Sequence, residues 1–289
     1  MNPPREERLA RLLWSPENDV PCYVSENPYP LDVTRIDATA LCLAHTFGVS
    51  SEDVDAIQVT ESSSGKEVFL VDGKYPLEPQ KEYSILLSAE ASTKYDKRLP
   101  ISQIFSLVPG ATEDEQSDRL QALSNNFYEK IWHADHISAD FRKSFVNPMS
   151  SYEIQAYRQF NWFCEVFGGP TMYDEKGEGE RYYKPRTMAK HTASRMTLEH
   201  SLTWLKLMRT TLDETMSDAP EFQTALEVYW LHFYAMFPFS DENRREFERV
   251  MLEVRSSSKN AQEVNDHVGD ELAETQEKLV KSQVTEQVK

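Results

Sequence analysis

In the second half of the chain, apolar residues recur every three or four positions in four separate stretches. In the first stretch, for example, Leu120, Leu123, Phe127 and Ile131 lie on one face of a helix. This spacing is typical of amphipathic helices that bury one side. The pattern therefore predicts four main helices, over about residues 117–131, 150–167, 197–216 and 219–237.

Local signals mark the ends of these helices. The acidic run Thr112-Glu113-Asp114-Glu115 precedes the first helix, where carboxylates stabilise the positive end of the helix dipole. Gly168-Gly169-Pro170 ends the second helix, because glycine takes the left-handed conformation readily and proline cannot continue a helix. Asp218-Ala219-Pro220 opens the fourth with a capping residue and a proline. We expect a helical domain over residues 117–254.

The first part of the chain has a different pattern. Residues 1–20 are charged and lack periodicity, which predicts a flexible arm. Residues 21–89 predict a small α/β module in the order β-α-β-β-β, with its helix starting at Asp37. Short runs of β-forming residues give the expected strands, at 22–24, 57–60, 67–71 and 83–87. The arrangement is compatible with a ubiquitin-like grasp, and no motif in it indicates a function.

Two further segments complete the expected organisation. Residues 90–116 are interpreted as a linker. Residues 255–289 form a polar tail, either disordered or a solvated helix. Its sparse apolar positions, among them Val264 and Leu272, could instead form a stripe that binds a partner.

Composition excludes several classes of function. The formal charge of −17 argues against nucleic acids and anionic membranes as partners, because an acidic protein repels polyanions, and it favours a basic partner protein. No apolar run approaches the ~20 residues that cross a bilayer. Three cysteines and no recognisable secretory leader argue against disulfides. We expect a soluble protein of the cytoplasm.

Histidines are the main candidates for metal chemistry. His133-Ala134-Asp135-His136 places two histidines three residues apart around an acid, but a zinc site needs a third ligand, and no other Cys or His is suitably placed. His191 stands in a polar stretch between the second and third helices. Taken alone, it could be an ordinary surface or core histidine.

An ordered set of residues gives His191 a more specific meaning. Asn126-Phe127-Tyr128 is followed by Phe141, then by Phe167-Gly168-Gly169-Pro170 and Tyr173, and finally by His191 with Trp204 thirteen residues later. In this order and spacing, residues 117–237 resemble a truncated haemoglobin of the group II type. The resemblance implies a mainly α fold, a short helical sandwich that holds haem b, preceded here by the α/β module and followed by the polar tail.

The resemblance also implies roles around the haem iron. His191 resembles the proximal ligand, and a hydrogen bond from its second ring nitrogen would fix the tautomer. Tyr128 resembles the distal tyrosine, whose hydroxyl points at the bound gas. Gln155 and Gln159 take ligand-facing positions on the second helix, with solvent-facing glutamines as the alternative. Trp204 resembles the tryptophan whose indole N–H reaches toward the ligand, with core packing as the alternative.

Other residues would contact the porphyrin. Phe141 would stack on it, Trp162 and Phe163 would add apolar walls, and Tyr173 would lie nearby. These aromatic residues could equally be plain core. Arg186 and Lys190 would pair with the propionates, unless they are solvated loop charges. The chain departs from the family pattern by about six extra residues after Phe141 and by a longer loop after Pro170, which affects the placement of Arg186 most.

Two functions follow from the resemblance. The iron, five-coordinate through His191, would bind dioxygen, nitric oxide and carbon monoxide, and the donor-rich pocket would hold dioxygen tightly. Such a protein could detoxify nitric oxide or peroxide as a dioxygenase or peroxidase. It would need an external reductase, because the chain has no Gly-rich dinucleotide fingerprint. Alternatively, it could store or sense a gas and signal to a protein partner through the N-terminal module.

Overall fold

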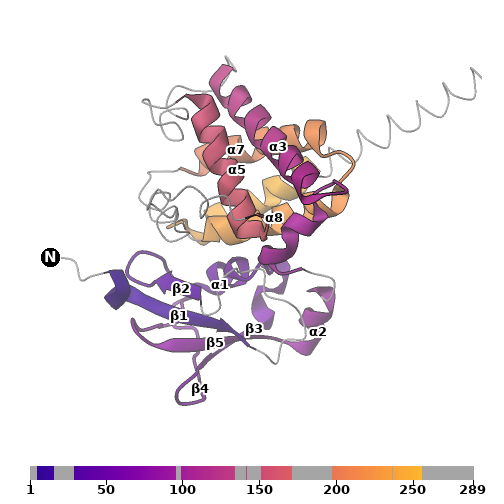
Figure 1. Ribbon diagram of the computed structural model, residues 1–289. Coiled ribbons are helices and arrows are strands. Elements are labelled where there is room, and N and C mark those ends of the chain that lie inside the picture. Colours follow the sequence, from indigo (N-terminus) through magenta and orange to yellow (C-terminus); the bar gives the residue numbers. More distant parts are fainter. Residues whose placement is uncertain are drawn as a thin grey trace, which may run out of the picture. The chain divides into compact units, whose positions relative to one another are not determined.

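The computed structural model describes residues 5–15, 29–95, 99–133, 141, 151–170, 197–235 and 237–255. Its contacts divide the chain into two units, Met1–Glu248 and Arg249–Lys289. The first unit contains a five-stranded sheet and four long helices (Figure 1). In the second unit, the described residues 249–255 are helical.

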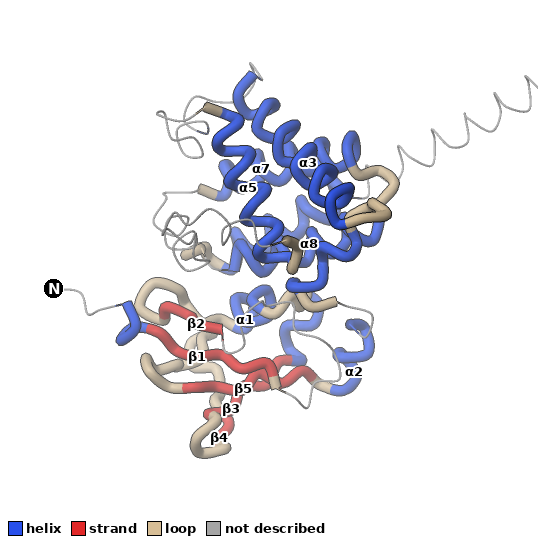
Figure 2. Tube along the Cα trace, viewed as in Figure 1, coloured by secondary structure: helices blue, strands red, loops and turns tan. Residues whose placement is uncertain are grey.

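The N-terminal module is a mixed sheet crossed by one helix (Figure 2). Its strands are β1 (Leu9–Trp14), β2 (Tyr29–Asp32), β3 (Ile57–Glu61), β4 (Lys66–Glu67) and β5 (Glu82–Leu87), in the spatial order β2-β1-β5-β3-β4. The central pair β1 and β5 is parallel, and the other neighbours are antiparallel. A helix, α1 (Ala40–Thr46), follows the first hairpin. This strand order is that of a ubiquitin-like grasp.

The structure differs from the sequence-based expectation in three places within this module. The expected flexible arm contains strand β1, which pairs with two neighbours and buries Ala10, Leu12 and Trp14. The strand expected at 67–71 is reduced to β4, and Phe69 is 67% exposed. The helix is capped by Thr39, whose hydroxyl accepts from the Cys42 N–H, rather than by Asp37. The strand expected at 22–24 lies outside the described residues.

Short helices follow the sheet where a linker was expected. They are α2 (Ala89–Ser92), η3 (Thr93–Tyr95) and η4 (Ile101–Leu107). Two other short helices belong to the module itself, η1 (Arg5–Arg8) before β1 and η2 (Ser51–Ala56) before β3. Helix η4 buries Ile101, Ile104 and Phe105 and packs against the long helices that follow. Residues 101–107 are therefore part of the packed helical domain.

The four long helices confirm the periodicity of the second half. They are α3 (Glu113–His133), α5 (Tyr152–Phe167), α7 (Leu198–Thr215) and α8 (Pro220–Ala235). Helix α3 packs against both α5 and α7. A buried ion pair joins α7 to α8, with Arg209 Nη1 2.9 Å from Glu227 Oε1. Residues 241–255 form a further helix that the periodicity had not singled out.

Helix α5 ends in a close backbone approach. Gly168 adopts the left-handed conformation (φ +81°), and a Cβ at this position would lie 1.8 Å from the Ser102 carbonyl oxygen. A Cβ on Gly169 would lie 2.5 Å from the ring of Phe105. The glycine pair thus serves two purposes, since it ends the helix and allows η4 to pack directly against that end.

Helix α1 is almost entirely buried, between the sheet and α8. The His232 Nδ1 donates to the Thr46 carbonyl (2.7 Å), and the Cys42 thiol contacts the Ala235 carbonyl (3.7 Å). His45 Nε2 lies 3.2 Å from the Glu248 carboxylate, which also accepts from the Ser51 N–H. Cys42 and Cys164 are free thiols, whereas Cys22 lies outside the described residues.

Gly168→Ala should lower the free energy of unfolding by more than ~2 kcal/mol. The left-handed backbone alone costs about 1–2 kcal/mol for a residue with a Cβ, and the contact with Ser102 adds to it. Gly65→Ala is the matched control, because Gly65 has φ +66° and no atom lies within 4 Å of the position that a Cβ would take there. Urea unfolding of both variants measures the difference. Equal losses in the two variants would contradict the close approach.

Acidification should weaken the contact between α1 and α8. Burial lowers the pKa of His232 to about 4, and the hydrogen bond to Thr46 offsets this only in part. The unfolded chain binds a proton below about pH 6.5, so stability falls as the pH decreases from about 6.5 to about 4. His232→Gln, which keeps a donor for Thr46, should flatten the urea midpoint across this range. The exposed His133→Gln is the control, and an unchanged slope in His232→Gln would refute the assignment.

Burial alone would raise the pKa of Glu248, but the hydrogen bond and charge of His45, with Ser51 and Ser50, lower it to about 2. Its contribution to stability is therefore present above about pH 4.5 and is lost as the pH falls toward 2.

Candidate functional site

Helix α3 places Tyr128 beside the aromatic core. Phe127 lies on the buried face of α3, and the next residue, Tyr128, is half-buried with its ring 5.4 Å from that of Phe127. Burial raises the pKa of Tyr128 to about 12, and the charge of Arg158 on α5 opposes this shift. The phenol is therefore protonated at neutral pH. Its hydroxyl makes no hydrogen bond with another residue in the described ranges, so its donor is available.

Helix α7 brings Trp204 to the same cluster. The indole is buried, with its ring 5.4 Å from Phe127 and 5.6 Å from Trp230 of α8. Both ring pairs are edge-to-face, the geometry that aromatic quadrupoles favour. Tyr128 and Trp204 thus both contact Phe127.

Helix α5 carries the two glutamines, one turn apart and both half-buried. The side-chain oxygen of Gln159 is buried and has no hydrogen-bond partner in the part of the chain that the structure describes. Such an orphaned oxygen is uncommon in proteins, because an unpaired buried polar group is destabilising. Arg158, between the two glutamines, is close enough to Tyr128 to affect its pKa.

Phe141 lies against a residue that sequence reasoning missed. Phe141 is fully buried, and its ring centroid is 6.0 Å from that of His200 at an interplanar angle of 73°. The Nδ1 of His200 is buried and lacks a hydrogen-bond partner among the described residues. The signal in the sequence was the helical spacing, since His200 precedes Trp204 by four residues and shares its side of α7.

Trp162 and Phe163 face α8 and the end of α5. The Trp162 indole donates to the Tyr229 hydroxyl on α8 (2.9 Å), and Phe163 stacks on Phe167 with ring centroids 5.1 Å apart. Burial raises the pKa of Tyr229 far above its usual range, so that hydroxyl also stays protonated. The structure thus places Trp162 at the contact between α5 and α8, whereas Phe163 packs on the end of its own helix.

The remaining predicted site residues lie outside the described ranges. They are Tyr173, Arg186, Lys190 and His191. The structure therefore describes the expected distal side and the aromatic core, which hold Tyr128, Gln155, Gln159, Phe141 and Trp204. Of the alternative zinc motif, only His133 is described. Among the described residues, no group of three or more His, Cys, Asp or Glu could hold a metal ion.

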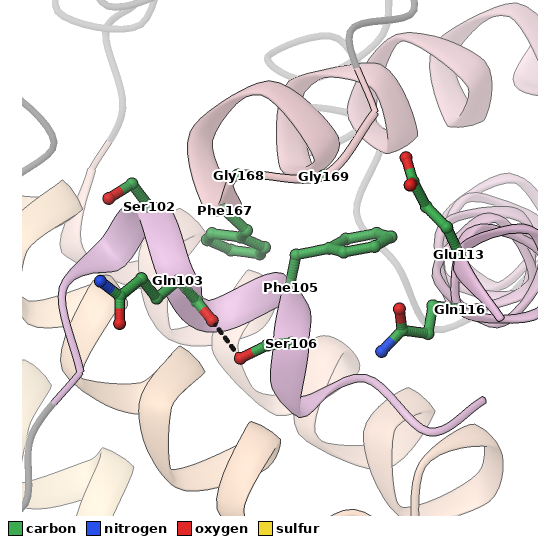
Figure 3. Close-up of a pocket in the computed structure, with 9 residues that line it drawn as sticks. All are labelled: Ser102, Gln103, Phe105, Ser106, Glu113, Gln116, Phe167, Gly168 and Gly169. Atoms are coloured by element: carbon green, nitrogen blue, oxygen red, sulfur yellow. Dashed lines mark hydrogen bonds between the residues drawn. The ribbon is translucent and has the colours of Figure 1, made fainter. Parts of the chain in front are cut away.

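A cavity of about 510 Å³ lies elsewhere, between η4, the start of α3 and the end of α5 (Figure 3). Its lining residues are Ser102, Gln103, Phe105, Ser106, Glu113, Gln116, Phe167, Gly168 and Gly169. It contains none of the predicted haem-site residues. This cavity lies beside the close approach of η4 to Gly168, and its lining contains no residue of the candidate site.

The distal residues fit a bound polar group. An amide oxygen on α5 (Gln159) and a ring nitrogen on α7 (His200) are buried and lack partners within the described ranges, and burial keeps the Tyr128 phenol on α3 protonated. Helices α5 and α7 both pack against α3 and make little direct contact with each other there. A planar haem requires this kind of surrounding, with aromatic rings at its face and a few unpaired donors and acceptors.

Comparison with known proteins identifies the helical domain. Residues 115–236 match the family model of the bacterial-like globins. Searches of curated proteins and of solved structures gave no match. No helix among the described residues is long and apolar enough to cross a membrane. The matched range spans α5, α7, α8 and all of α3 except its first two residues. Residues 115–236 are thus a domain of the globin family, whose members bind haem, within a chain that also carries an N-terminal α/β module.

Proposed function

We propose that this domain binds haem b through His191 and holds dioxygen and related diatomic gases in a pocket of the group II type. The observation that carries this proposal is the Tyr128 phenol, which is protonated, lacks a partner within the described ranges and lies beside the Phe127–Trp204 ring pair. When bound, haem would supply a ferrous iron that takes up a gas. A protonated hydroxyl beside that position would stabilise a ligand that gains negative charge.

The other residues would divide between the ligand and the porphyrin. Tyr128 would donate to the ligand, Trp204 would offer its indole N–H, and Gln159 and Gln155 would present their amides from α5. Phe141 would pack on the porphyrin, with Tyr173 nearby, while Trp162 and Phe163 would support the wall from the α8 side. Arg186 and Lys190 would neutralise the propionates.

Tight retention of dioxygen favours a role in detoxification. A site with several donors releases dioxygen slowly, which suits reaction with nitric oxide or turnover of reactive oxygen better than transport. The chain would then depend on an external electron donor to return the iron to the ferrous state. Nitrate formation that requires an added reductase is the readout of this role.

The second candidate is a gas sensor, and one contact favours it. Helix α8 packs its Trp230 against Trp204 and donates from His232 to Thr46 of the N-terminal module. A shift of Trp204 on gas binding would therefore reach the module through a single helix. Gas-dependent binding of a protein partner to the module, without nitrate formation, is the readout that distinguishes this role.

His191→Ala should abolish the stoichiometric binding of haem to the purified protein. The wild type should show a saturable Soret band that shifts on reduction by dithionite and again with carbon monoxide, because neutral imidazole is the ligand that holds the iron. Absorption titration with haem measures this. His133→Ala, at the exposed end of α3, is the control. A wild type without saturable haem binding would refute the proposal.

Tyr128→Phe should raise the dioxygen dissociation rate by about 10- to 100-fold, because a hydrogen bond to a charged acceptor is worth about 1.5–3 kcal/mol. Carbon monoxide gains little charge on binding, so its dissociation should change much less. Stopped-flow displacement measures both rates. Tyr157→Phe, an exposed tyrosine on α5, is the matched control. An unchanged dioxygen rate in Tyr128→Phe would remove Tyr128 from the pocket.

A further inference from the structure

The main chain of His200 is held by a hydrogen bond to the helix cap, whereas the Nδ1 of its side chain has no hydrogen-bond partner among the described residues. His200 is the third residue of α7, and its N–H donates to the hydroxyl of Thr197, which caps the helix. The imidazole is thus not needed to cap α7. Its Nδ1 is nevertheless buried and has no partner among the described residues, while its ring lies edge-on to Phe141.

In the apo-protein, an apolar side chain at position 200 would stabilise the fold more than histidine does. The ring contact with Phe141 needs only an apolar surface, and a buried nitrogen without a hydrogen bond destabilises the fold. Ser201 and Trp204, the neighbouring buried positions of α7, form the adjoining part of the same side of the helix. The nitrogen is therefore best explained by a partner that a bound molecule supplies.

We infer that His200 is a haem-binding residue whose ring nitrogen hydrogen-bonds a propionate of the bound haem. This inference rests on the proposed haem site. His200 contacts Phe141, the residue expected to stack on the porphyrin, so its ring would lie beside a bound porphyrin. The only polar groups on the rim of haem b are its two carboxylates, and the half-exposed start of α7 keeps them near solvent. His200 would be a propionate partner on α7, in addition to Arg186 and Lys190, the two expected from the sequence.

The test compares apo and haem-loaded protein in three variants. His200→Leu removes both nitrogens at similar size, His200→Gln keeps a donor, and His133→Leu is the exposed control. His200→Leu should leave the unfolding temperature of the apo-protein unchanged or raised. It should accelerate haem transfer to excess apomyoglobin about tenfold, the loss expected for one charge-assisted hydrogen bond. His200→Gln should lie between His200→Leu and the wild type.

Haem dimethyl ester separates the propionates from other partners. Because the ester lacks free carboxylates, wild type and His200→Leu should release it at the same rate. A tenfold difference that persists with the ester would overturn the propionate assignment. Lower apo stability with unchanged haem release would make His200 a structural residue and would leave the proposed function intact. Failure of the wild type to bind haem would instead refute the proposed function itself.

Discussion

Helix α8 is almost without a solvent-exposed face, and the rest of the structure depends on how that helix is covered. From Ala225 to Ala235, every residue is buried or half-buried. A helix that is apolar all round is stable in water only when other elements enclose it. Here α7 and η4 contact α8, and α1 of the N-terminal module packs against it as well. The module is thus part of the hydrophobic enclosure of the helical domain.

Enclosing α8 also buries polar groups, and several of these groups are paired. Arg244 donates to the carbonyls of Tyr234 and Phe237 at the end of the helix. His232 is paired with Thr46. Among the described residues, the Gln159 oxygen, the His200 Nδ1 and the Trp230 indole nitrogen lack such partners. The last two belong to rings in contact with Phe141 and Trp204, and buried polar atoms of this kind are usually paired in proteins.

The sequence predicted the helices much better than the contacts between them. The bounds of α3, α5, α7 and α8 follow from a 3.6-residue period with clear end signals, and the structure agrees within a few residues. Strand β1 was missed because its alternation is too short to be distinguished from a polar arm. The candidate site shows the same division. A family resemblance singled out Tyr128, Phe141 and Trp204 as candidate site residues. Nothing in the sequence around His200, by contrast, shows that its ring nitrogen is buried and that its ring lies against Phe141.

The contact between His232 and Thr46 joins residues 186 positions apart, and it is one of several contacts between the two parts of the first unit. Trp204 packs on Trp230, and His232 follows two residues later, about half a turn around the same helix. A displacement of the Trp204 indole therefore cannot be absorbed by α8 without changing its packing on α1, because closely packed interiors transmit strain. Coupling between Trp204 and α1 through α8 does not require a flexible segment between them. Helix α8 thus offers a direct packed path from Trp204 to the N-terminal module, whichever chemistry the iron performs.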